Sequence, residues 1–132
     1  MGGRVMANGF PYRGYRDLKV YQLSYTLAQE IFEATKTFPK EEKYALIDQM
    51  RRSSRSIAAN LSEAWYKRRY AKSFIAKLID VAGEVGETEV WLDFSFDHGY
   101  LEKEKHCHFR EKYTEVAKML AGMISHPEKF CH

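Results

Sequence analysis

Hydrophobic residues recur at steps of three and four along most of this chain, which is the spacing of one face of an α-helix. The clearest run lies in residues 43–72, where an apolar stripe is interrupted only by Ser53 and Ser54. The stripe consists of Leu46, Ile47, Met50, Ile57, Leu61 and Trp65. The small serines would let a neighbouring helix approach closely. We therefore expect a long helix from near Pro39 to about Lys67, with the rest of the chain packed around it.

Three further segments repeat this pattern, at residues 17–36, 72–97 and 102–125. Their expected core positions are Val20, Ser24, Leu27, Ile31, Ala34 and Phe38, then Ile75, Leu78, Ala82, Val85, Glu89, Leu92 and Phe96, and finally Phe109, Tyr113, Val116, Leu120 and Met123. Four amphipathic helices joined by short connections predict an all-α fold, an antiparallel up-down-up-down four-helix bundle.

The residues between these segments predict where the helices begin and end. Asp17 is an expected N-cap, and Gly99 has the C′ role after the third helix. Gly83 and Gly86 lie inside that helix, where each costs about 1 kcal/mol relative to alanine, a cost that usually indicates close backbone packing. The expected organisation is a flexible N-terminal arm at 1–16, a four-helix bundle domain at 17–126 and a C-terminal tail at 127–132.

Composition and charge narrow the class of protein. With 45% hydrophobic and 30% charged residues the chain is an ordinary globular sequence. It has no apolar run near the ~20 residues of a membrane helix and no leader-like segment, so we expect a cytoplasmic location. Residues 1–72 hold 14 Lys/Arg against 7 Asp/Glu, and residues 73–132 hold 7 against 11. This asymmetry indicates either an anionic partner or like subunits whose opposite charges meet.

Motifs for catalysis or for metal binding do not emerge. A di-iron bundle needs Glu-x-x-His pairs, and no histidine here follows an acidic residue by three positions. Neighbours in the segment His106-Cys107-His108 point about 100° apart on a helix, which does not form one tetrahedral site. Gly83-Glu84-Val85-Gly86 lies within a helix rather than after a strand, so it is not a dinucleotide loop. We expect no enzyme, no cofactor and no metal.

Two groups of basic residues carry the candidate chemistry. Arg51, Arg52 and Arg55 lie in the second helix, opposite Glu87 and Glu89 of the antiparallel third helix. One interpretation is an interhelical ion-pair cluster, because a charge in a core stripe is costly unless it is paired. The other is that some of these arginines contact a phosphate backbone.

The second group is the exit of the long helix, where Lys67, Arg68, Arg69 and Lys72 surround Tyr70. Long basic side chains at a helix end are expected to stay solvated and reach outward, and tyrosines can stack on unpaired bases. The alternative interpretation is an ordinary solvated turn.

Over residues 15–100 the chain resembles a bacterial family of four-helix-bundle proteins, those encoded by intervening sequences of the large-subunit (23S) ribosomal RNA gene. The matching residues are Asp17-Leu18, Val20-Tyr21-Gln22, Thr37-Phe38-Pro39, Glu42, Gln49, Arg51-Arg52, Ser56-Ile57, Asn60-Leu61, Glu63, Arg68, Phe74, Leu78, Ala82-Gly83, Glu87 and Glu89. The resemblance implies a non-enzymatic bundle that assembles into a ring-like homopentamer. The accessory variability protein of diversity-generating retroelements is related, and there the resemblance implies binding of nucleic acid and of a reverse transcriptase.

Aromatic residues also favour a homo-oligomer, because four core stripes cannot use all nineteen. Those largely outside the stripes are Tyr15, Tyr21, Tyr25, Tyr66, Tyr70 and Trp91. A pentamer is the expected assembly and a dimer the alternative. Two functions follow from these observations. One is an RNA-binding or DNA-binding accessory factor, and the other is a protein–protein scaffold whose arginines are structural.

Overall fold

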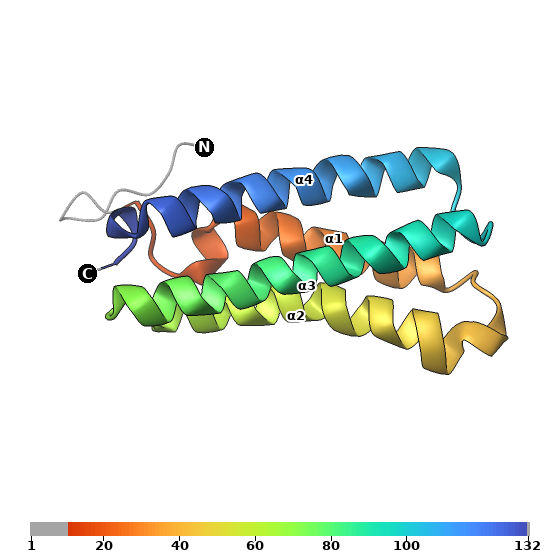
Figure 1. Cartoon of the computed structure of the whole chain (residues 1–132), viewed down its shortest axis with the longest axis horizontal. Helices are drawn as coiled ribbons and strands as arrows, with labels where there is room; N and C mark the ends of the chain where they lie inside the picture. Colours follow the sequence, from red (N-terminus) through yellow and green to blue (C-terminus); the bar gives the residue numbers. More distant parts are fainter. Residues whose placement is uncertain (1–10, 132) are drawn as a thin grey trace.

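The structure is a computed structural model that describes residues 11–131. Its four long helices lie side by side as a rod (Figure 1). They are α1 (Lys19–Thr35), α2 (Asp48–Tyr66), α3 (Ala71–Asp97) and α4 (Lys103–Ser125). Short 3-10 turns occupy Tyr15–Asp17, Lys40–Glu42 and Pro127–Lys129, and a π-helical turn, Lys43–Ile47, leads into α2.

Each long helix packs against the next along the chain, and α4 closes the bundle against α1. The α2–α3 pair makes the most extensive interface. The connections run alternately at the two ends of the rod, so neighbours are antiparallel (Figure 1). No strand occurs between residues 11 and 131. The predicted all-α up-down-up-down bundle is confirmed.

Two of the four predicted stripes form the core as expected, and a third differs at one position. All six apolar residues of the α2 stripe are buried, as are Ser53 and Ser54 and the five residues predicted for α4. In the first stripe, Ala34 is only half-buried and Thr35 is buried beside it. The reason is that a helix with 3.6 residues per turn drifts relative to strict alternation of three and four.

The predicted α3 stripe was wrong at four of its seven positions. Ala82 is exposed, and Ile75, Glu89 and Phe96 are only partly buried. The buried face consists of Phe74, Leu78, Val81, Val85, Thr88, Leu92 and Ser95. It was missed because two of its members are polar.

These polar members satisfy their hydroxyl groups inside the bundle. Thr88 Oγ1 lies 2.8 Å from Ser53 Oγ on α2 and 2.8 Å from the carbonyl oxygen of Glu84. Ser95 Oγ donates to the carbonyl oxygen of Trp91 at 2.8 Å and lies 3.2 Å from the Met50 sulfur. Small hydroxyl side chains on both helices therefore let α2 and α3 pack closely without unpaired polar atoms at these positions.

The helix ends agree with the sequence at one position and differ at another. Gly99 has a φ of 79°, the left-handed conformation that suits glycine after α3. Asp17 is not the N-cap of α1, because Leu18 occupies that position. The Asp17 carboxylate instead accepts a hydrogen bond of 2.8 Å from the backbone N–H of Arg13.

Residues 11–18, residues 126–131 and the α2–α3 turn lie at one end of the rod (Figure 1). Residues 1–10 of the predicted arm lie outside the described residues, as does the last residue of the predicted tail. Within the described part, Tyr12 stacks on Phe130 with ring centroids 5.8 Å apart and meets Trp65 edge-on at 6.4 Å. Phe130 also contacts Phe74 at 6.1 Å. The segments of Tyr12 and Phe130 are thus held together at the end where α2 turns into α3.

Candidate nucleic-acid interface

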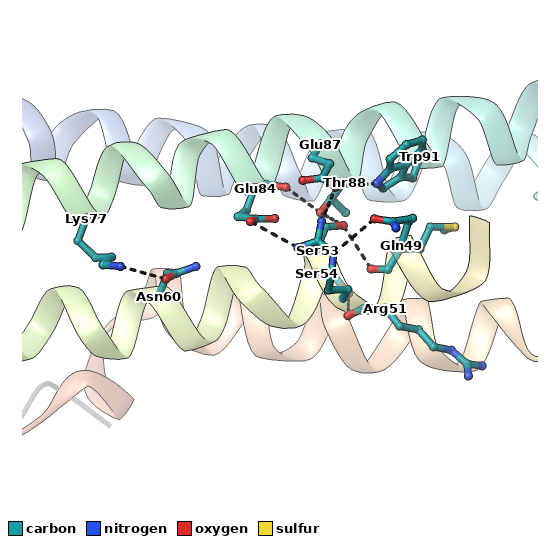
Figure 2. Close-up of polar contacts among 12 residues, drawn as sticks. Gln49, Arg51, Ser53, Ser54, Asn60, Lys77, Glu84, Glu87, Thr88 and Trp91 are labelled. Atoms are coloured by element: carbon teal, nitrogen blue, oxygen red, sulfur yellow. Dashed lines mark hydrogen bonds and ion pairs between the residues drawn. The ribbon is translucent and has the colours of Figure 1, made fainter. Parts of the chain in front are cut away.

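A row of polar contacts joins α2 to α3 along the side of the bundle (Figure 2). The Arg52 guanidinium forms an ion pair with Glu87 and lies 3.7 Å from Glu84, and the Trp91 indole N–H donates to Glu87 at 3.3 Å. Farther along, Lys77 lies 2.8 Å from Glu63. The predicted ion pair between these helices is therefore present, formed by Arg52 with Glu87.

This pair is not buried, since the side chains of Arg52 and Glu87 are 49% and 32% exposed. Glu89 takes no part in it. Residues two positions apart on a helix point about 200° away from each other, so Glu87 and Glu89 cannot both face α2. Glu89 instead lies near Asp93 of α3 and Arg110 of α4. Burial and, after it, the Asp93 charge raise the pKa of Glu89.

Glu84 is a member of this cluster that was not predicted from the sequence. Its spacing of three residues from Glu87 places both carboxylates on the same face of α3, which is the signal that identifies it. Burial and then the nearby Glu87 charge raise the Glu84 pKa, against the opposing influence of Arg52. Arg52 thus lies between two carboxylates and is matched by charge within the chain.

Arg51 points away from Glu84 and Glu87 (Figure 2). Its Nε donates to Thr35 Oγ1 at 2.9 Å, near the C-terminal end of α1, and its guanidinium lies 4.6 Å from the Phe32 ring centroid. The Arg55 guanidinium is 5.8 Å from the same ring, and Arg55 is exposed. Of the three mid-helix arginines, Arg55 is therefore the one best placed to contact an external phosphate.

Arg68 does not reach outward as expected. Its Nε donates to the carbonyl oxygen of Trp65 at 2.8 Å, and its guanidinium carbon lies 3.5 Å from a Trp65 ring centroid. Burial lowers the Arg68 pKa. The planar guanidinium of Arg68 can stack on the indole and at the same time donate a hydrogen bond to a carbonyl oxygen at the end of α2. These two contacts explain why Arg68 does not extend into solvent.

The remaining predicted residues of this group are exposed: Lys67, Arg69, Tyr70 and Lys72. The fold brings further basic residues to the same end, since residues 11–19 and 126–131 also lie there (Figure 1). Together with residues 67–72, these segments contain eight Lys/Arg and two Asp/Glu. We call this region the basic end. The additional cations of the first segment are Arg13, Arg16 and Lys19, each exposed.

Tyrosines of two separate segments meet at the basic end. Tyr15 lies 5.0 Å from Tyr21 and 6.2 Å from Tyr66, and Tyr21 lies 6.0 Å from Tyr25, measured between ring centroids. The Arg16 guanidinium lies 4.7 Å from the Tyr15 ring. Tyr66 and Tyr25 are 76% and 53% exposed. This cluster cannot be read from the sequence, because residues 15–25 and Tyr66 become neighbours only through packing of α1 against α2.

The remaining exposed tyrosine of this group, Tyr70, is 65% exposed, whereas Trp91 is half-buried against the core. Other exposed aromatic side chains lie away from the basic end: Tyr44 in the π-helical turn before α2, and Phe94 on α3.

The histidine-rich start of α4 has a structural explanation. His106 lies 2.8 Å from Asp93 on α3 and stacks on Phe96, while His108 lies 2.7 Å from Glu30 on α1. The two rings therefore face different helices. In the described part of the chain no three His, Cys, Asp or Glu residues are grouped as metal ligands. Across the same residues, no helix is both long enough and apolar enough to cross a membrane.

Comparison with known proteins places this bundle among relatives. No curated protein matches the sequence. A crystal structure of a protein of unknown function from the S23 ribosomal protein family of Bacteroides thetaiotaomicron is similar, with 31% identity and a TM-score of 0.72. The match covers 80% of this chain and 95% of that one. The family model described as 23S rRNA-intervening sequence protein matches residues 16–122. The chain therefore belongs to the 23S rRNA-intervening sequence protein family.

Proposed function

We propose that this protein is a non-enzymatic, homo-oligomeric accessory factor that binds nucleic acid, with RNA as the preferred class, through its basic end. One observation carries the proposal: three segments far apart in the sequence converge there with eight Lys/Arg and two Asp/Glu, beside a cluster of tyrosines of which Tyr25 and Tyr66 are exposed. Both cysteines are free thiols, which suits the reducing cytoplasm as the place of action.

The basic side chains and the tyrosines at the basic end would contact different parts of a nucleic acid. Lys67, Arg69 and Lys72 are exposed and would neutralise phosphates, which supplies affinity for any sequence. Tyr66 and Tyr70 present open ring faces, on which unpaired bases would stack for about 1–3 kcal/mol each. Single strands should therefore bind more tightly than duplexes of the same length.

Assembly would multiply these modest charges. The resemblance implies a ring of five, and a ring with one basic end per subunit would present a continuous cationic rim. Light scattering should then give about five times the chain mass of 15.5 kDa. The mass of a dimer would support self-association but contradict the pentamer. The mass of a monomer at micromolar concentration would contradict self-association altogether.

The binding test compares two triple variants by fluorescence anisotropy on labelled 20-nucleotide RNA and DNA, single-stranded and duplex. Lys67→Ala/Arg69→Ala/Lys72→Ala removes cations of the basic end. Lys40→Ala/Lys103→Ala/Lys105→Ala removes three exposed lysines at the opposite end. The first should weaken all four probes and flatten the salt dependence of log Kd by about 2–3 units.

The second triple variant should bind as the parent does, because its lysines lie far from the basic end. Equal losses for both variants would mean that only net charge matters, and no loss for the first would remove the basic end as the binding site.

A second function, an oligomeric protein–protein scaffold, is favoured by the internal partners of three arginines. Arg51, Arg52 and Arg68 are all held by contacts within the chain. In a scaffold these three arginines would be purely structural, and the partner would be another protein. The resemblance to the retroelement relative implies a reverse transcriptase as the class of that partner. Absence of measurable binding to all four probes at low salt would favour this function.

A further inference from the structure

The solvent-facing side of α3 carries a second apolar stripe that the core does not use. Its members follow one another in steps of three or four, and all are exposed. They are Ala76, Ile79, Gly83, Gly86, Val90 and Phe94, and we call this set the outer α3 stripe. Ile79, Val90 and Phe94 are 56%, 48% and 47% exposed. Among the described residues, every other large exposed hydrophobic side chain is a tyrosine.

Two glycines at the middle of this stripe have no explanation within the chain. Both are helical, and glycine destabilises a helix interior relative to alanine. A Cβ atom added at Gly83 or Gly86 would meet nothing within 4 Å among the described residues. Close packing inside the bundle therefore does not require glycine here. Glycine would be required if a helix from outside the bundle approached closely here, because the distance between two helix axes depends on the side chains at the crossing.

Charge identifies the occupant. Residues 71–97, which form α3, hold six Asp/Glu against two Lys, whereas the rest of the chain holds 19 Lys/Arg against 12 Asp/Glu. Four of the six, Asp80, Glu84, Glu87 and Asp93, have basic partners inside the chain. The complementarity between α3 and the remainder of an identical chain is therefore one of net charge, −4 (two Lys less six Asp/Glu) against +7 (19 less 12). Nucleic acid would be repelled by the acidic α3. A second copy of the chain already supplies a basic surface, so no other protein is needed as the partner.

We infer that the outer α3 stripe is the surface on which a helix of a second copy of this chain packs, with the crossing at Gly83 and Gly86. The inference rests on the homo-oligomeric part of the proposed function and not on the nucleic-acid part. The flanking Ile79 and Val90 would cover the crossing on either side, and Phe94 would extend the contact toward the C-terminal end of α3.

The test uses glycine substitutions whose effects on the subunit and on the assembly have opposite signs. Gly83→Leu/Gly86→Leu places leucines, which favour helix, at positions that are open in the subunit. The matched control is Gly122→Ala on α4, an exposed helical glycine that also has nothing within 4 Å of an added Cβ. Mass is measured by light scattering over a concentration series without nucleic acid, and helicity by circular dichroism.

The parent and Gly122→Ala should assemble alike, whereas the double leucine variant should remain helical and dissociate at least tenfold more readily, toward 15.5 kDa. Val90→Lys, a second variant that leaves both glycines in place, should weaken assembly in the same direction. Assembly of either variant with the parent's dissociation constant would overturn the inference, as would a parent that stays monomeric. Because no nucleic acid is present, these results are independent of RNA binding, which the anisotropy experiment tests separately.

Discussion

The α2–α3 interface and the basic end use the same residue types for different purposes. In the interface, Arg52 lies between Glu84 and Glu87, while the neighbouring Arg51 is directed away from α3 onto Thr35 and Phe32 of α1. At the basic end, acidic residues are scarce and Lys67 and Arg69 are exposed. Cationic charge in a sequence therefore says little about ligand binding until the internal partners are known. The region where cations outnumber acidic partners is the one to test for binding.

The largest expected effect is on folding, and it separates an arginine with internal partners from an exposed one. Arg51→Ala removes the hydrogen bond to Thr35 and the contact with Phe32, and should lower the free energy of unfolding by about 2 kcal/mol. The exposed Arg55 is the matched control, and Arg55→Ala should change it by less than about 0.5 kcal/mol. Urea unfolding followed by circular dichroism measures both. Equal effects would mean that the contact of Arg51 with α1 contributes nothing particular.

A slightly smaller effect should divide neighbours within the basic end itself. Arg68→Ala removes a charged donor from the Trp65 carbonyl and a guanidinium from its ring, which should cost about 1–2 kcal/mol of stability. Arg69→Ala should leave the melting temperature unchanged and weaken RNA binding. Calorimetry and anisotropy on the same two variants check this division. The comparison would fail if Arg69→Ala destabilised the fold as much as Arg68→Ala does.

The Arg52–Glu87 pair should contribute modestly, because both side chains are substantially exposed. A double-mutant cycle with Arg52→Ala and Glu87→Ala should give a coupling energy of about 0.2–1 kcal/mol, and less at high salt. A coupling of 3 kcal/mol or more, about the value for a buried pair, would show that the pair is shielded from solvent in the assembled protein.

The smallest effect is a pH dependence at Glu89. Its pKa is raised by burial and by Asp93, so the folded state binds a proton more readily than the unfolded state. Stability should therefore fall as the pH rises from the ordinary glutamate pKa to the raised value, and then stay level. Glu89→Gln should raise the melting temperature slightly at pH 7 and not below about pH 4. An equal shift at both pH values would exclude titration of Glu89 as the cause.

The fold was predictable because three helices have one apolar face each. The third helix has two, the buried face and the outer α3 stripe, and residues such as Ala82 lie between them. Periodicity alone cannot choose between two stripes on one helix. The buried stripe was harder to recognise because two of its members, Thr88 and Ser95, are polar. Resemblance to the family nevertheless identified the bundle correctly.

The candidate site was only partly predictable. The Arg52–Glu87 pair follows from antiparallel packing of neighbouring helices, and the run of Lys67 to Lys72 is visible in the sequence. The position of Arg68 against Trp65 depends on a rotamer choice that periodicity does not contain. The contribution of Arg16 and Tyr15 depends on where residues 11–19 pack, which is a tertiary contact between distant segments.

The hydrogen-bonded hydroxyls of Ser53 and Thr88 set the register of α2 against α3. If one helix slid by a single turn, Thr88 would face Ile57, and Ser53 would lose its partner inside the interface. Each hydroxyl would keep its contact with a carbonyl oxygen of its own helix, that of Glu84 for Thr88 and that of Met50 for Ser53. The slip would therefore lose the one interhelical hydrogen bond, which contributes about 1 kcal/mol. A purely aliphatic interface would tolerate such a slip far better. This pair of small side chains thus favours one register of α2 against α3.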